Sequence, residues 1–204
     1  MDALEKIFNS PAQVKIMRLF LYSADTAFDF ETIKNKTQLS SRLAGKVVHR
    51  LFAADFIRQR TALKSLPPNA RRGGSQKRLK GWILNQRFLY LEQFKNLLMR
   101  CQASERVAIS KRFARAGRIK LLAISGVFLQ SESSRVDILL VGDHLRHAVI
   151  TQSLKAIEAS MGKDLRYAVL ETKDFLYRLS VYDKFVRDIL DYPHEKLVDR
   201  FGLR

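Results

Sequence analysis

The sequence predicts a mixed α/β protein, α+β overall, with two domains joined by a helical linker. Two observations carry this prediction. Apolar residues recur with helical spacing over most of residues 1–118, interrupted by one pair of short strand patterns. From residue 119, apolar strand patterns and helical stretches follow one another, as in α/β domains. We place the domains at residues 1–85 and 119–204 and the linker at 86–118, since 204 residues allow two real cores.

The net charge of +17 is distributed unevenly along the chain. Residues 1–118 carry 24 Lys and Arg against 8 Asp and Glu, whereas residues 119–204 carry 13 against 12. Solubility alone does not require such a split. A basic front half therefore favours a polyanionic partner.

The first 54 residues predict helices separated by short breaks. A short helix carries Leu4 and Phe8, and the next runs from Ser10-Pro11, an N-cap followed by proline, to about Tyr22. We expect residues 28–30 to form either a short strand or a hydrophobic staple, in which an apolar side chain packs against the first turns of a helix over 31–36. After a turn at 37–39, Ser40 caps a helix over 41–54.

The helix over 41–54 has two different faces. Its apolar stripe is predicted to consist of Leu43, Val47, Leu51 and Ala54. The residues off this stripe, which we expect to be exposed, are Ser41, Arg42, Gly45, Lys46, His49 and Arg50.

A basic β-hairpin follows this helix. Strand patterns over 56–63 and 81–84 enclose a Pro- and Gly-containing segment that is too long for a tight turn. We interpret residues 64–80 as the hairpin tip. Its cations are Arg71, Arg72, Lys77, Arg78 and Lys80.

A helix, a short helix, a tight turn, a capped helix and a basic hairpin are the parts of a winged helix-turn-helix. The order of apolar and cap positions in this region resembles that of the winged helix domains of bacterial and archaeal transcription regulators. The matching positions are Phe30–Ile33, Leu39–Ser41, Val47–Val48, Leu51 and Phe56–Ile57. Asp55 departs from the family, which usually has a left-handed Gly there, but Asp tolerates that conformation better than most residues.

The resemblance implies a sequence-specific regulator that binds double-stranded DNA. Helix 41–54 would read bases in the major groove, and the wing over 64–80 would contact phosphates or the minor groove. Homodimers are usual in this family, because palindromic sites match two-fold symmetry. The sequence of the linker predicts two helices. Their cations either extend the phosphate contacts or lie in water beside an apolar dimer interface. These cations are Arg100, Arg106, Lys111, Arg112, Arg115 and Arg118.

Residues 119–204 predict three strands over 119–124, 136–142 and 166–170, a helix over 145–162, and a helical remainder. This region resembles minimal nucleotidyltransferase domains. The resemblance lies in Ser125–Gly126, in Ser134–Gly142 and in the segments around Asp174 and Asp183. Active members use a Gly-Ser pair and two carboxylates, one residue apart, to hold the nucleotide and two metal ions.

Here Val127 stands in the Ser position and Arg135 replaces the first carboxylate, which leaves Asp137 alone. We expect Arg135 to pair with Asp137, and we expect no enzymatic activity. Gly126, Arg135 and Asp137 are a candidate pocket for a nucleotide or another anionic ligand; the alternative is a domain for assembly without a ligand. The four His are scattered and Cys101 is the single cysteine, so we expect no metal and no cofactor.

Two other functions stay open at this point: an active nucleotidyltransferase that modifies a protein or RNA, and an antitoxin-like or RNA-binding module. The N-terminus lacks the apolar region of a signal peptide, and no apolar run reaches the length of a membrane span. A single cysteine fits a reducing compartment. We therefore expect a cytoplasmic protein with no membrane partner.

Overall fold

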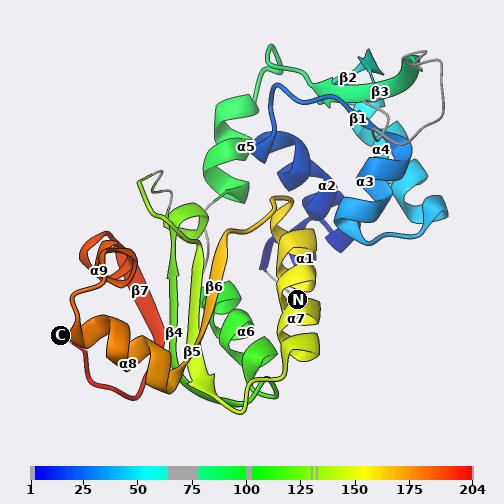
Figure 1. The fold of residues 1–204 in the computed structure, drawn as a ribbon. Coiled ribbons are helices and arrows are strands. Elements are labelled where there is room, and N and C mark those ends of the chain that lie inside the picture. Colours follow the sequence, from blue (N-terminus) through cyan, green and yellow to red (C-terminus); the bar gives the residue numbers. More distant parts are fainter. Residues whose placement is uncertain (1–2, 64–77, 100–102, 130, 132, 204) are drawn as a thin grey trace, which may run out of the picture. The chain divides into compact units, whose positions relative to one another are not determined.

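The computed structural model describes residues 3–63, 78–99, 103–129, 131 and 133–203. It confirms that the chain has mixed α and β structure (Figure 1). Contacts divide the chain into two compact units: residues 3–99 with 159–163, and residues 100–158 with 164–203. The two helices expected in the linker fall into different units, the first into unit 1 and the second into unit 2.

Unit 1 combines helices with one antiparallel sheet. Its helices are α1 (Ala3–Ile7), α2 (Pro11–Tyr22), α3 (Phe30–Thr37), α4 (Ser41–Ala53) and α5 (Leu91–Leu98). Its strands are β1 (Phe28–Asp29), β2 (Ile57–Leu63) and β3 (Arg78–Leu84), in the order β1-β3-β2. The sheet therefore consists of the β2–β3 hairpin with the short β1 on its outer edge.

Short polar residues precede three helices of unit 1, α2, α3 and α4. The Ser10 hydroxyl accepts the Gln13 N–H at 3.2 Å at the start of α2, as the Ser-Pro pattern predicts. Asp29 Oδ1 accepts the Thr32 N–H at 2.7 Å at the start of α3. Ser40 occupies the predicted cap position of α4, but its side chain makes no capping hydrogen bond.

The core of unit 1 gathers around α2, which buries Val14, Ile16 and Phe20 among others. Helix α4 contributes Ala44, Val47, Val48 and Leu51. The predicted stripe was therefore wrong in part, because Leu43 and Ala54 are exposed. At 100° per residue, Leu43 lies about a quarter of a turn from the centre of the buried stripe.

Unit 2 is a four-stranded sheet with helices on both faces (Figure 1). Its helices are α6 (Ala103–Phe113), η1 (Gly126–Phe128), α7 (His147–Met161), α8 (Thr172–Ser180) and α9 (Lys184–Asp191). Its strands are β4 (Arg118–Ser125), β5 (Ile138–Asp143), β6 (Tyr167–Glu171) and β7 (His194–Asp199), in the order β6-β5-β4-β7. Only the β5–β6 pair is parallel among the described strands.

Alternate residues of β4 serve the two faces of this sheet. Leu121 and Ala123 pack with Phe175 of α8 and Val186 of α9. Leu122 pairs in register with Val198 and is also fully buried. A strand that is buried on both faces explains the continuous apolar run in this part of the sequence.

Strand β7 corrects the prediction that the C-terminal segment is helical throughout. It pairs antiparallel with β4, with Leu122 opposite Val198. Its sequence, His-Glu-Lys-Leu-Val-Asp, mixes charged and apolar residues, and every one of them is half-buried. Such an edge strand carries no clear period of two, so only its pairing partner reveals it.

Candidate nucleic-acid interface

Helix α4 presents a polar face opposite its buried stripe. Of the six residues predicted for this face, five are exposed: Ser41, Arg42, Lys46, His49 and Arg50. Residues four apart stack on one side of a helix, so the three cations among them form a ridge about 12 Å long. The structure thus brings together the basic residues that the sequence assigned to this helix.

Two of these three cations have no partner among the described residues. Arg42, Lys46 and His49 have no side-chain hydrogen bond or ion pair within the described part of the chain. Arg50 differs, because its Nη1 donates to Gln13 Oε1 of α2 at 3.2 Å. Gly45 is half-buried at the edge of the face, where a Cβ atom would make an ordinary 3.8 Å contact with the Phe30 ring.

A tight turn sets the direction of α4 relative to α3. Gln38 adopts a left-handed conformation with φ of 52°, and the Leu39 N–H donates back to the Lys34 carbonyl at 3.2 Å. The buried Thr37 hydroxyl donates to the Ile33 carbonyl at 2.7 Å. These bonds satisfy the last carbonyls of α3 and end it before α4 begins.

The β2–β3 hairpin carries a second set of cations. Lys80 of β3 is exposed opposite Thr61, and Arg78 begins the strand. The other predicted wing residues, Arg71, Arg72 and Lys77, lie outside the described residues. Of the predicted wing residues, the structure therefore places Lys80 and the backbone of Arg78.

Strand β2 adds two exposed arginines that we did not predict, Arg58 and Arg60. They are two residues apart, so both point to the same face of the hairpin. Arg60 lies opposite Gly81, which has no side chain to cover it. Arg58 Nε lies 3.6 Å from Asp55 Oδ1, whereas Arg60 has no ion pair among the described residues. The Arg-Gln-Arg alternation within a predicted strand was the available signal.

The base of the hairpin is fastened to the end of α4. Asp55 has φ of 58°, which is the left-handed conformation that winged helix domains usually have at this position through a Gly. The buried Asn85 side chain donates to the Asp55 carbonyl at 2.7 Å, and the Asn85 N–H donates to the Phe56 carbonyl at 2.9 Å. Helix and hairpin are thereby held in a fixed relation.

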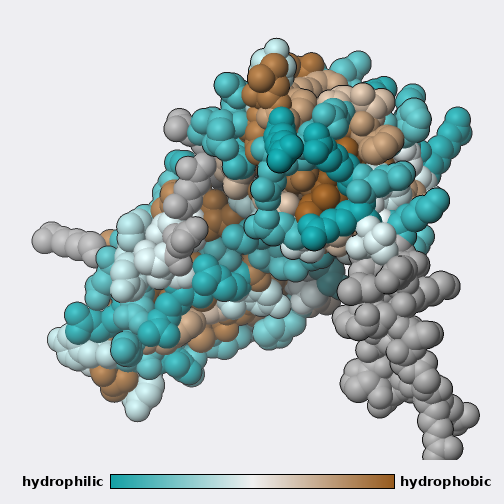
Figure 2. Space-filling view, turned by 90° about the horizontal axis from the view of Figure 1, so that it is seen from above, coloured by the Kyte–Doolittle hydropathy of each residue, from teal (hydrophilic) through white to brown (hydrophobic). Residues whose placement is uncertain are grey.

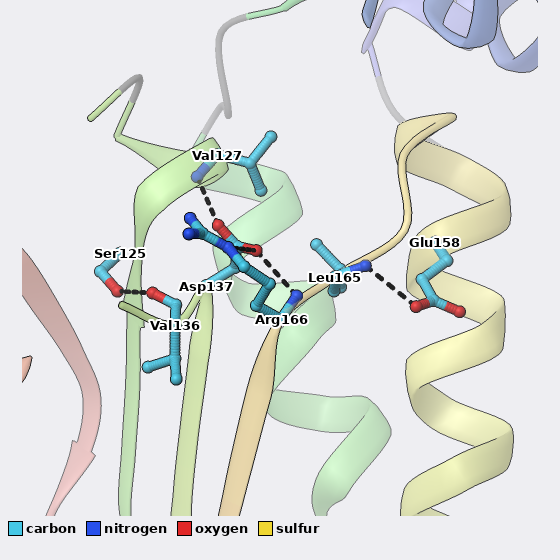
Figure 3. A network of polar contacts seen from close by, with 7 residues as sticks. All are labelled: Ser125, Val127, Val136, Asp137, Glu158, Leu165 and Arg166. Carbon is cyan, nitrogen blue, oxygen red and sulfur yellow. Dashed lines mark hydrogen bonds and ion pairs between the residues drawn. The ribbon is translucent and has the colours of Figure 1, made fainter. Parts of the chain in front are cut away.

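In unit 2, Asp137 is a buried carboxylate whose two oxygens are bonded inside the protein (Figure 3). Oδ1 accepts the Val127 N–H at 2.9 Å. Oδ2 accepts the Arg166 N–H at 2.8 Å and lies 3.5 Å from Arg166 Nε. Figure 3 shows the Arg166 side chain lying along the carboxylate.

The expected pairing of Arg135 with Asp137 is wrong. The Arg135 guanidinium pairs with Asp188 of α9, and Arg166 takes its place beside Asp137. The three residues of the candidate ligand pocket are therefore split: Gly126 and Asp137 lie together, while the Arg135 side chain pairs elsewhere. Gly126 has φ of 54°, and a Cβ atom there would lie only 2.1 Å from Asp137 Oδ1.

This arrangement limits what the carboxylate can do. Each of its oxygens already accepts one backbone N–H, and Arg166 adds a positive charge beside Oδ2, which opposes a metal cation there. Among the described residues, no group of three or more His, Cys, Asp or Glu is placed to hold a metal ion. Ser134 precedes Asp137 by three residues, and its buried hydroxyl has no hydrogen-bond partner in the described structure.

Comparisons of the chain with protein-family models, with curated proteins and with solved structures found no match. Within the described residues, no helix has both the length and the apolar character needed to cross a membrane. The exposed cations of unit 1 and the bonded carboxylate of unit 2 are the features that bear on function.

Proposed function

We propose that the chain is a sequence-specific regulator that binds double-stranded DNA through a winged helix domain over residues 1–85. Helix α4 is the recognition helix, and the β2–β3 hairpin is the wing. The observation that carries the proposal is the face of α4 with Arg42, Lys46 and His49, which have no partner in the described part of the chain.

The geometry supports insertion of α4 into the major groove. The groove is about 12 Å wide and admits one helix, and its base edges distinguish all four base pairs. Arg42 and Lys46 donate to guanine O6 and N7 or to phosphates. Arg58 and Arg60 on one face of the hairpin and Lys80 on the other contribute phosphate contacts, which add affinity without sequence preference.

For the C-terminal region, we propose a nucleotidyltransferase-like domain that serves assembly or sensing and transfers no nucleotide. The support is chemical: one carboxylate remains, and Val127 and Arg166 already occupy its oxygens. Two-metal phosphoryl transfer needs more acidic ligands than this.

We also propose that the protein forms a homodimer. Exposed apolar side chains of unit 1 support a partner surface on that unit: Leu89 is 78% exposed and Leu97 46%. Figure 2 shows apolar side chains in brown gathered among hydrophilic ones on the face in view.

Random-site selection on duplex DNA with the full-length protein tests the main proposal. We expect an enriched motif, palindromic if the protein is a dimer. Arg42→Ala and Lys46→Ala should lose the preference for that motif, whereas Lys173→Ala, an exposed lysine on α8, should keep it.

Three outcomes would overturn parts of the proposal. Selection without any enriched sequence excludes sequence-specific binding. Preference for structured RNA at moderate salt favours the RNA-binding module, because A-form grooves do not admit α4 in the same way. Transfer of an α-phosphate label from ATP to a protein or RNA in the presence of Mg²⁺, with release of pyrophosphate, would show an active nucleotidyltransferase.

A further inference from the structure

Unit 2 contains a cavity of about 360 Å³ between α6, β4 and β7. Its apolar lining includes Phe113 of α6, Leu122 of β4 and Val198 of β7. Its polar lining includes Ser110, Arg118 and Arg200. Arg118 begins β4, whereas Gly126 and the Asp137 network lie beyond the other end of that strand. The cavity is thus separate from the candidate pocket around Asp137.

The arginines that line this cavity have no ion pair among the described residues, although Asp143 stands opposite Arg118 where β4 pairs with β5. No Asp or Glu lines the cavity. A second cavity of unit 2, about 430 Å³, offers the contrast. Its cations are compensated, since Arg187 lies 3.6 Å from Asp191 and Lys196 lies 3.4 Å from Asp199.

The backbone holds the walls of the cavity in place. The Arg200 N–H donates to the Lys120 carbonyl at 2.8 Å, which extends the pairing of β4 with β7. Gly117, where α6 gives way to β4, has φ of 137°. A Cβ atom there would lie 2.8 Å from the His144 carbonyl oxygen, so the close approach requires glycine.

We propose that this cavity binds a small organic phosphate monoester through Arg118 and Arg200. A phosphate monoester carries close to two negative charges at pH 7, which matches two guanidinium groups that have no ion pair among the described residues. Guanidinium forks bind phosphate oxygens in pairs, and the Ser110 hydroxyl offers one more donor. The volume lies within the range of about 300–1,000 Å³ that is typical of ligand pockets.

The apolar lining favours a small ligand over the DNA backbone. Phe113, Leu122 and Val198 can pack against an aromatic or aliphatic body attached to the phosphate. A backbone phosphodiester carries one charge and brings no such body into a cavity. This proposal does not depend on DNA binding, so each proposal can fail without the other.

Isothermal titration calorimetry on the full-length protein provides the test, with phenyl phosphate as the probe. We expect phenyl phosphate to bind more tightly than inorganic phosphate, which lacks the ring, and than benzoate, which carries one charge. Its affinity should rise between pH 5 and pH 7, as the phosphate loses its second proton near pH 6.

Replacement of both arginines, Arg118→Ala with Arg200→Ala, should weaken phenyl phosphate binding at least tenfold. Arg187→Ala, in the compensated cavity, is the matched control and should leave binding unchanged. If the alanine variant fails to fold by circular dichroism, Arg118→Lys with Arg200→Lys serves instead. It keeps both charges, loses the guanidinium forks, and should show a smaller loss of binding.

The proposal is overturned if phenyl phosphate does not bind at millimolar concentration. It is also overturned if a folded double variant binds as tightly as the unchanged protein. A double variant that loses affinity for duplex DNA but keeps phenyl phosphate binding would assign the two arginines to the DNA-binding surface instead.

Discussion

Single residues in unit 2 connect segments that are distant in sequence. The Asp137 carboxylate joins the start of η1, through the Val127 N–H, to the residue that precedes β6, through the Arg166 N–H. The backbone adds to this link, because the Asp137 N–H donates to the Arg166 carbonyl at 2.6 Å. A carboxylate with these bonds stabilises the end of the sheet, and loss of them would leave buried N–H groups without acceptors.

Gly126→Ala tests this connection. The added Cβ atom would lie 2.1 Å from Asp137 Oδ1, so the carboxylate must move and release the Val127 N–H. We expect a loss of about 3 kcal/mol or more in the free energy of unfolding, from the left-handed backbone and the broken bond together. Chemical denaturation of the full-length protein measures it.

Gly202→Ala is the matched control for that change. Gly202 also has a positive φ, 65°, but a Cβ atom there would meet nothing within 4 Å. It should cost only about 1–2 kcal/mol, the price of the left-handed backbone alone. Equal losses for the two variants would contradict the role assigned to Asp137.

Asp199 provides a pH-dependent contribution to stability. Burial alone would raise its pKa, but the N–H groups of Phe201 and Gly202 and the Lys196 ammonium outweigh this and lower the pKa below its ordinary value of 3.8. A depressed pKa in the folded state contributes stability above the ordinary value, and this contribution is lost as the pH falls through the folded value.

Asp199→Asn should therefore destabilise the protein at pH 6 by about 1 kcal/mol, with a difference that shrinks below pH 4. Unfolding curves for both proteins between pH 3 and pH 6 provide the measurement. A difference that stays constant across this range, or grows at low pH, would mean that the ionised carboxylate does not stabilise the fold.

At the scale of elements, periodicity predicted the helices better than the pairing of strands. Helix α2 begins at Pro11 and ends at Tyr22, as its cap and apolar spacing indicated. Strand β7 was missed because half-buried edge residues carry no period of two. The pairing of Arg135 with Asp188 was missed for a related reason, since 53 residues separate them and only the packing of α9 brings them together.

The two basic elements of unit 1 should respond differently to mutation. Arg42→Ala and Lys46→Ala on α4 should reduce affinity for the selected motif about tenfold or more and leave binding to unrelated DNA less affected. Arg58→Ala with Arg60→Ala on β2 should weaken binding to all duplexes alike. Fluorescence anisotropy with specific and scrambled duplexes separates the two effects. Uniform losses for the α4 variants would contradict the recognition-helix assignment.

At the scale of the whole molecule, the position of the charge matters more than its sum. The excess of Lys and Arg lies in residues 1–118, and in the described part it includes the exposed Arg42, Lys46, Arg58, Arg60 and Lys80. Composition alone revealed this asymmetry. It did not reveal that Arg42 and Lys46 have no partner among the described residues, because that depends on which side chains the fold brings near them.

The same charge distribution predicts a steep dependence of DNA affinity on salt. These cations and those predicted for the wing would together neutralise roughly 6–10 phosphates, and release of the condensed counterions should lower affinity about 10³–10⁵-fold between 50 and 200 mM salt. Anisotropy titrations of the full-length protein across this range give the slope.

Arg58→Ala with Arg60→Ala should reduce the slope by about two, since each phosphate contact contributes about one. Lys173→Ala, in the nearly neutral second half, should leave it unchanged. A shallow slope for the unchanged protein would mean that the basic half does not lie along a nucleic-acid backbone.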